Sequence, residues 1–170
     1  MASWIRTLAA ENVIFHYMKD LISIVNYIVE KSIQMKDKYT GVKDSSIEFA
    51  CVFCQNNEEY EKLTNEIEAL GKVVQSTNTG FTYKLNQPLN TKAGLLSLVK
   101  IRKPDPLRKE RGDTDFNTNY QDFKKKYGDK QNFELVKRED FEMLRLSNPQ
   151  NNVMVCFSSI PLSKVLGIGL

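Results

Sequence analysis

Four charged residues fall on predicted strands at positions where they could meet in a binding cleft: Glu48, Lys100, Arg102 and Glu142. An arginine guanidinium can grip a carboxylate or phosphate through two parallel hydrogen bonds, and a neighbouring lysine adds a second positive charge. This combination is typical of a site that recognises a small anionic or polar ligand, with Arg102 as the clamp. The alternative is that the charges pair with one another on a solvated face of the sheet.

Strand periodicity predicts which of these side chains share a face, because successive residues of a strand point to opposite sides of the sheet. Lys100 and Arg102 are two residues apart and therefore lie together. Glu48 is expected on the cleft side of its strand, because the bulkier alternate residues would pack under a helix. Glu142 is expected in the cleft as well. Alternation places it on the same face as Leu144 and Leu146, and it places Arg145 on the opposite face.

The cysteine pattern Cys51-Val52-Phe53-Cys54 has the spacing of a redox or zinc motif. On a strand, however, a separation of three sends the two thiols to opposite faces, so they cannot converge on a metal or form a disulfide. No second CxxC and no histidine pair completes a zinc set. We therefore expect buried, structural cysteines.

A long helix is predicted over residues 12–35 from one stripe of apolar residues: Ile14, Met18, Leu21, Val25, Ile28 and Met35. The stripe either covers a face of the chain's own domain or pairs with a second copy in a homodimer, since its spacing is also heptad-like. The single histidine, His16, falls on the opposite side of this helix. A surface histidine is one interpretation, and a ligand or general base is the other.

Composition bounds the class of protein. The chain has 170 residues, 41% hydrophobic and 26% charged residues, and a net charge of +3. These values fit one soluble domain with an added arm, and the charge is too small and too mixed to indicate a nucleic-acid partner. The short lysine run 124–126 is expected to be solvated. With neither a signal-peptide pattern nor a long uncharged apolar run, we expect a cytoplasmic protein without a membrane partner.

The rest of the chain divides into two halves with the same order of elements: strand, helix, strand, strand, strand. In the first half the helix begins at the cap Asn56, with Glu59 as its partner, and in the second at Thr118, with Gln121. The first strands are predicted at 47–54 and 115–117, and the three later strands of each half at 72–76, 81–85 and 95–103, and at 133–138, 141–146 and 153–158.

A paired βαβββ unit is the architecture of the glyoxalase, or vicinal-oxygen-chelate (VOC), superfamily, and this chain resembles that superfamily from about residue 46 to residue 158. The likeness lies in the element order, in FACVFCQNNEEYEKLTNEIEALGKVV as a first unit and in FEMLRLSNPQNNVMVCFSS as the closing strands. It is most similar to the YecM-like branch, which also places helices before the paired units.

The resemblance implies a concave sheet face that holds a divalent metal through side chains on the first and last strands of each unit. The matching first strands offer Glu48 and either Asp113 or Asp115, but a matching last strand offers Lys100 and Arg102, which would repel a dication. Neither unit contains a histidine, so we expect no metal and no cofactor. The alternative is a hard cation held only by the carboxylates of Glu48, Asp115 and Glu142.

The predicted fold is therefore α+β: two pseudo-symmetric βαβββ units forming a curled mixed β-sheet, preceded by a long N-terminal helix. The expected boundaries are an arm at 1–45, a paired domain at 46–160 with units at 46–103 and 113–158, and a tail at 161–170. The predicted function is binding of a small polar or anionic ligand between the units. The alternative is a non-catalytic interaction or dimerisation domain, and no reaction is predicted. The expected ligand-binding residues are Glu48, Lys100, Arg102, Asp113, Asp115 and Glu142.

Overall fold

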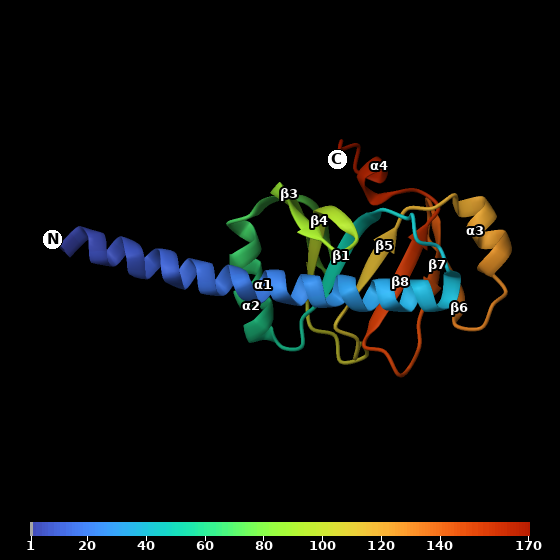
Figure 1. Cartoon of the computed structure of the whole chain (residues 1–170), viewed down its shortest axis with the longest axis horizontal. Helices are drawn as coiled ribbons and strands as arrows, with labels where there is room; N and C mark the ends of the chain where they lie inside the picture. Colours follow the sequence, from blue (N-terminus) through green and yellow to red (C-terminus); the bar gives the residue numbers. More distant parts are fainter. Residues whose placement is uncertain (1) are drawn as a thin grey trace.

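The computed structural model describes the backbone of residues 2–170 and the side chains of residues 20–170 (Figure 1). Within that range lie four helices and eight strands. The helices are α1 (Ala2–Thr40), α2 (Asn57–Glu68), α3 (Tyr120–Tyr127) and α4 (Leu162–Val165). The strands are β1 (Ile47–Phe53), β2 (Gly71–Thr77), β3 (Gly80–Thr91), β4 (Gly94–Arg102), β5 (Gly112–Phe116), β6 (Phe133–Lys137), β7 (Glu142–Leu146) and β8 (Val153–Ser158).

The strands form one open, eight-stranded mixed sheet in the order β2-β3-β4-β1-β5-β8-β7-β6. Strands β1 and β5 pair antiparallel at its centre. On either side of this seam the pattern repeats, because β4 runs parallel to β1 and β8 runs parallel to β5. The two predicted βαβββ units and their pseudo-symmetry are therefore confirmed.

Helix α1 lies across one face of the sheet and covers strands from both units (Figure 1). Its residues Leu21, Val25 and Ile28 are fully buried in the main core. Helices α2 and α3 contribute further apolar side chains to the same core, and the sheet contributes Ala50, Val52, Val99, Ile101, Phe116, Leu144 and Leu146. The opposite, concave face of the sheet carries a small separate cluster around Phe53.

The predicted helical stripe does cover the chain's own domain over residues 21–35, where its members Leu21, Val25, Ile28 and Met35 are buried. The side chains of Ile14, His16 and Met18 lie outside the described residues. Pairing of the helix with a second copy stays a prediction. Among the residues that the structure describes, no helix is both long enough and apolar enough to cross a membrane.

Three local predictions are wrong in detail. The strand predicted at 115–117 is β5, which begins earlier, at Gly112, and ends at Phe116. The strand predicted at 81–85 continues to Thr91 as β3, because Pro88 lies at a register shift between Lys84 and Leu89, where a missing N–H is tolerated. Helix α3 begins after Asn119 and not at a Thr118 capping box. Helix α2 begins as predicted, because the Asn56 side chain accepts a hydrogen bond of 2.8 Å from the backbone N–H of Glu59.

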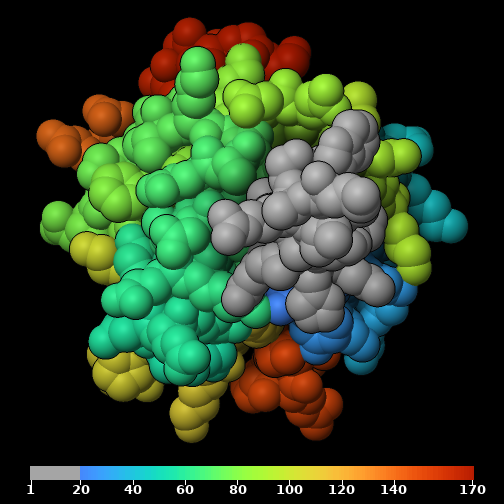
Figure 2. All heavy atoms as spheres, turned by 90° about the vertical axis from the view of Figure 1, so that its left-hand side faces the viewer, coloured from blue at the N-terminus to red at the C-terminus, as the bar shows by residue number. Residues whose placement is uncertain are grey.

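Different segments lie at the two ends of the strands, which are at the top and bottom of the space-filling view (Figure 2). Helix α4, in red, lies beyond one end of the strands (Figures 1 and 2). At the other end the crossover 103–111 between the units, in yellow, lies beside the β7–β8 turn, in orange-red. The concave face runs between these ends.

Candidate functional site

The concave face of the sheet, opposite α1, contains a cleft with two overlapping hollows of about 370 and 320 Å³. Volumes of this size are at the lower end of those that hold small ligands. Strands β1, β4 and β5 supply the floor, and β7 and the β6–β7 turn one wall. Five cationic side chains and two carboxylates line it: Lys100, Arg102, Arg108, Arg138, Arg145, Asp113 and Asp115.

Lys100 is held by the hydroxyls of the β2–β3 turn. Its Nζ donates hydrogen bonds of 2.8 Å to Thr77 Oγ1 and to Thr79 Oγ1. An ammonium group has three N–H donors, so one remains for a ligand. Burial lowers the pKa of Lys100, because the charged form loses hydration in the cleft.

Arg102 lies against Phe53, with its guanidinium 5.0 Å from the ring centroid. Its Nη2 donates a hydrogen bond of 3.0 Å to Asp105 at the start of the crossover. The side chain is only 20% exposed, yet its buried Nε has no hydrogen-bond partner among the described residues. The guanidinium is therefore positioned by an aromatic face and one carboxylate, and keeps unused donor capacity.

Arg145 was predicted on the face away from the cleft, and that placement is wrong. It lines the cleft with a side chain that is 15% exposed. Its Nη1 donates a long hydrogen bond of 3.4 Å to Glu134, and the side chain also hydrogen-bonds to Cys156. Its buried Nε also has no partner within the described residues. Arg108 and Arg138 likewise line the cleft, and neither forms an ion pair with any residue that the structure describes.

Asp113 and Asp115 lie in the cleft, on β5. Burial raises the pKa of Asp113 to about 6 and that of Asp115 to about 7, because a carboxylate loses its hydration there. Asp115 accepts hydrogen bonds from the backbone N–H and the hydroxyl of Ser158. Asp113 accepts no hydrogen bond from any described residue. The positive charges of four neighbouring side chains lower its pKa, but burial outweighs them: Arg145, Arg102, Lys100 and Arg108.

Glu48 does not line the cleft, and its predicted placement is wrong. The small residues Ala50 and Val52 take the helix side of β1, where α1 packs closely, while Phe49 and Phe53 fill the cleft side. Glu48 lies at a register shift of β1. Its buried carboxylate accepts hydrogen bonds from the Ser163 N–H of α4, at 2.7 Å, and from the Asn117 side chain, at 2.9 Å.

Glu142 also lies on the helix side, contrary to prediction, because it shares a face with Leu144 and Leu146 of the main core. Its carboxylate accepts hydrogen bonds from Tyr120 and Lys124 of α3. The hydrogen bond from Lys124 lowers the pKa of Glu142.

The carboxylate-only metal set of Glu48, Asp115 and Glu142 is therefore not brought together. Within residues 20–170, whose side chains the structure describes, no three His, Cys, Asp or Glu side chains are grouped so as to hold a metal ion.

The three cysteines are buried and unpaired, as free thiols. Cys51 faces the cleft and Cys54 faces the main core, which confirms that the two thiols of the CxxC point to opposite faces. Burial raises the pKa of Cys54 to about 12 and the pKa values of Cys51 and Cys156 well above the ordinary range. The three thiols therefore stay protonated near neutral pH, and a protonated thiol is a poor nucleophile.

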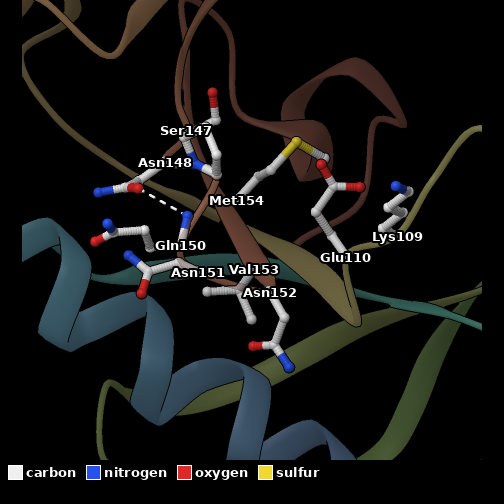
Figure 3. Close-up of a pocket in the computed structure, with 10 residues that line it drawn as sticks. Lys109, Glu110, Ser147, Asn148, Gln150, Asn151, Asn152, Val153 and Met154 are labelled. Carbon is white, nitrogen blue, oxygen red and sulfur yellow. Dashed lines mark hydrogen bonds between the residues drawn. The ribbon is translucent and has the colours of Figure 1, made fainter.

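A second cavity, of about 410 Å³, lies between the crossover and the β7–β8 turn (Figure 3). Asn148 Oδ1 accepts a hydrogen bond of 2.9 Å from the Gln150 N–H within the turn. The amide groups also tie the turn to α1, since Asn148 donates to the Tyr39 hydroxyl at 2.7 Å and Asn152 accepts from the Tyr27 hydroxyl at 3.1 Å. These contacts assign the amides a structural role, and the concave cleft is the stronger candidate site.

Comparison with known proteins gives information on the fold alone. No family model matches the chain, and neither does any curated protein. A solved structure named "Structural Genomics, Protein EC4020" superposes with a TM-score of 0.70 at 11% sequence identity, covering 89% of this chain and 92% of that chain. The overall fold of this chain is therefore similar to that of a solved structure of nearly the same extent.

Proposed function

We propose that this protein binds a small organic anion in the concave cleft between its two βαβββ units. The observation that carries the proposal is the charge of the cleft: five cationic side chains face two carboxylates whose pKa values burial raises to about 6 and about 7. Near neutral pH the carboxylates therefore carry less than their full charge, and the cleft is positive.

The donors that an anion needs are already held in place. Arg102 donates only through Nη2, so its Nη1 has no partner among the described residues, and Lys100 keeps one of its three donors. Leaving such groups unpaired in a half-buried cleft is unfavourable, and a bound carboxylate or phosphate would restore their hydrogen bonds. Because Arg102 is fixed by Phe53 and Asp105, little of its freedom would be lost on binding.

We also infer that the chain is a VOC-like protein. The repeated βαβββ order and the central antiparallel seam support this inference, and so does a concave site formed by both units. Cations occupy the last strand of the first unit, where the superfamily places metal ligands, so the proposed role of the cleft is anion recognition.

The test is isothermal titration calorimetry of the full chain with inorganic phosphate, sulfate and benzoate. We expect saturable binding that weakens as salt is added. The variant Arg102→Ala/Arg145→Ala should bind about 30-fold more weakly or not measurably, because each guanidinium supplies charge-assisted hydrogen bonds. Lys92→Ala is the matched control, since it removes an exposed cation that pairs with Glu30 outside the cleft.

Arg102→Lys adds a second test, because it keeps the charge and removes the fork of donors. It should bind more weakly than the wild type and more tightly than Arg102→Ala. Equal binding by the double variant and the wild type would place the site elsewhere. Failure of every anion to bind would favour the alternative of an interaction or dimerisation domain.

A further inference from the structure

We infer that the anion recognised by the cleft is amphipathic: a carboxylate or phosphate attached to an apolar chain or ring of about a dozen non-hydrogen atoms in total. This inference rests on the proposed function, because it describes the ligand of the same cleft. It adds a second half to the site, the apolar wall formed by Phe141, Ile160, Leu162 and Val165.

The two ends of the cleft differ in chemistry. Arg108, Arg145 and Cys156 line the smaller hollow and not the larger one. Phe141, Ile160, Leu162 and Val165 line the larger hollow and not the smaller one. Lys100 and Arg102 line both. A ligand that spans the cleft would therefore have its charge at one end and its apolar part at the other.

The apolar wall is left partly uncovered. Phe141, Ile160 and Leu162 are half-buried, and Val165 is 46% exposed. Neither of the core clusters includes any of the four. Apolar side chains gathered at one end of a concave site gain free energy when a ligand covers them. Met143, which borders both hollows, continues this surface toward the cations.

This wall is held in place by specific contacts. The buried Glu48 carboxylate accepts a 2.7 Å hydrogen bond from the Ser163 N–H, which fixes α4 over the strand ends. Further along the tail, Lys84 Nζ donates a 2.7 Å hydrogen bond to the Gly169 carbonyl. Leu162 and Val165 are therefore presented to the cleft by a segment anchored at two points.

The size of the cleft points the same way. The larger hollow has a volume of about 370 Å³. At about 30 Å³ for a group the size of a water molecule, it accommodates roughly a dozen non-hydrogen atoms. An acetate or inorganic phosphate ion would fill only part of it and would leave the apolar wall in contact with water. A medium-chain acyl carboxylate or an aryl phosphate would fill both ends.

The test is calorimetric titration of the full chain with acetate, butyrate, hexanoate and octanoate, together with inorganic phosphate and octanol. Each added methylene should tighten binding roughly three- to fourfold until the cleft is filled. Octanol should bind more weakly than octanoate, because it lacks the charge that the arginines recognise.

The variant Leu162→Asn/Val165→Asn should lose most of the dependence on chain length and bind acetate and phosphate as the wild type does. Phe141→Ala should show the same pattern without altering α4. Leu95→Asn is the matched control, because Leu95 is 66% exposed and does not line the cleft.

The outcomes separate the two proposals. Equal affinity for acetate and octanoate would overturn the amphipathic ligand and leave anion binding intact. Unchanged dependence on chain length in both wall variants would also overturn it. Binding of octanol as tightly as octanoate, or of no probe at all, would instead contradict the proposed function.

Discussion

Asp113 lies directly opposite Cys51 in the antiparallel pairing of β1 with β5, at the seam between the two units. Both side chains face the cleft, so a carboxylate and a thiol occupy the same poorly hydrated surface. Burial raises both pKa values, that of Asp113 to about 6 and that of Cys51 well above its ordinary range. The charged form of Asp113 is therefore disfavoured by the fold itself.

The first prediction concerns stability against pH. The pKa of Asp113 is about 6 in the folded chain and near 3.9 in an unfolded one, so the folded state holds the proton more tightly. The contribution of this group to stability is therefore full below pH 4 and is lost as the pH rises through 6. Asp113→Asn should be on the order of 1–2 kcal/mol more stable than the wild type at pH 8 and equal to it at pH 4.

Urea unfolding at pH 4, 6 and 8 measures this difference. Asp129→Asn, at an exposed position after α3, is the matched control and should show no such dependence. A lower stability of Asp113→Asn at pH 8 would mean that attraction to the neighbouring cations outweighs desolvation. The charged or titratable groups that act on Asp113 or line the same hollow are Lys100, Arg102, Arg108, Arg138, Arg145, Asp115, Cys51 and Cys156.

The second prediction concerns anion affinity against pH. As the pH falls through about 7 and then about 6, Asp115 and Asp113 take up protons, and the cleft loses negative charge. An alkyl sulfonate, which stays ionised throughout, should bind about threefold to tenfold more tightly at pH 5.5 than at pH 8. Asp113→Asn should bind more tightly than the wild type at pH 8 and show a smaller change with pH. Titration calorimetry at pH 5.5 and pH 8 measures this difference in affinity. An affinity that rises with pH would contradict the role given to Asp113 and Asp115.

The third prediction concerns the anchor of α4. Glu48→Leu removes the acceptor of the Ser163 N–H and of the Asn117 amide, so it should lower stability by about 1–3 kcal/mol. It should also free α4, and trypsin should cut after Lys164 roughly tenfold faster than in the wild type. Glu61→Leu, on the exposed side of α2, is the control for loss of a carboxylate. Unchanged cleavage would show that apolar contacts alone hold α4.

The fourth prediction concerns the fit of α1 on the central strands. A Cβ added at Gly112 would lie 2.2 Å from the Cys51 carbonyl oxygen and 2.6 Å from Ile28 Cδ1. Gly112→Ala should therefore destabilise the chain by about 1–3 kcal/mol or more, because backbone and helix must both shift. Gly169→Ala should have no such effect, since a Cβ there meets no atom within 4 Å. Thermal unfolding of both variants makes the comparison.

The order of the elements was predictable because its signals are local. Asn56 caps α2 in the structure as its sequence position indicates, and the alternation of β4 correctly placed Lys100 and Arg102 together. Alternation also correctly grouped Glu142 with Leu144 and Leu146. These inferences need only the few residues on either side.

The direction in which each face points was not predictable in the same way. Alternation tells which residues share a face, but the position of α1 decides which face becomes the core. Small residues such as Ala50 admit the helix, and the bulky Phe49 and Phe53 therefore turn to the cleft. The purely aliphatic pair Leu144 and Leu146 was the available signal that Glu142 follows the core.

Arg145 was assigned to the wrong face for this reason. Arg108 lies in the crossover, where no periodicity exists to place a side chain, and Arg138 lies in a turn. Their positions depend on how the second unit pairs with the first along β1 and β5, which is a relationship between distant parts of the chain.

Helix α1 precedes the first unit in the chain, and it packs both on β1 of that unit and on β5 and β8 of the second. Its last turns contact that unit again, where the Tyr127 hydroxyl donates to the Thr40 carbonyl and Asn148 donates to Tyr39. A cut in the crossover would therefore leave two fragments joined by this helix and by the central strand pairing. We expect such a nicked chain to remain associated and to melt as a single cooperative species.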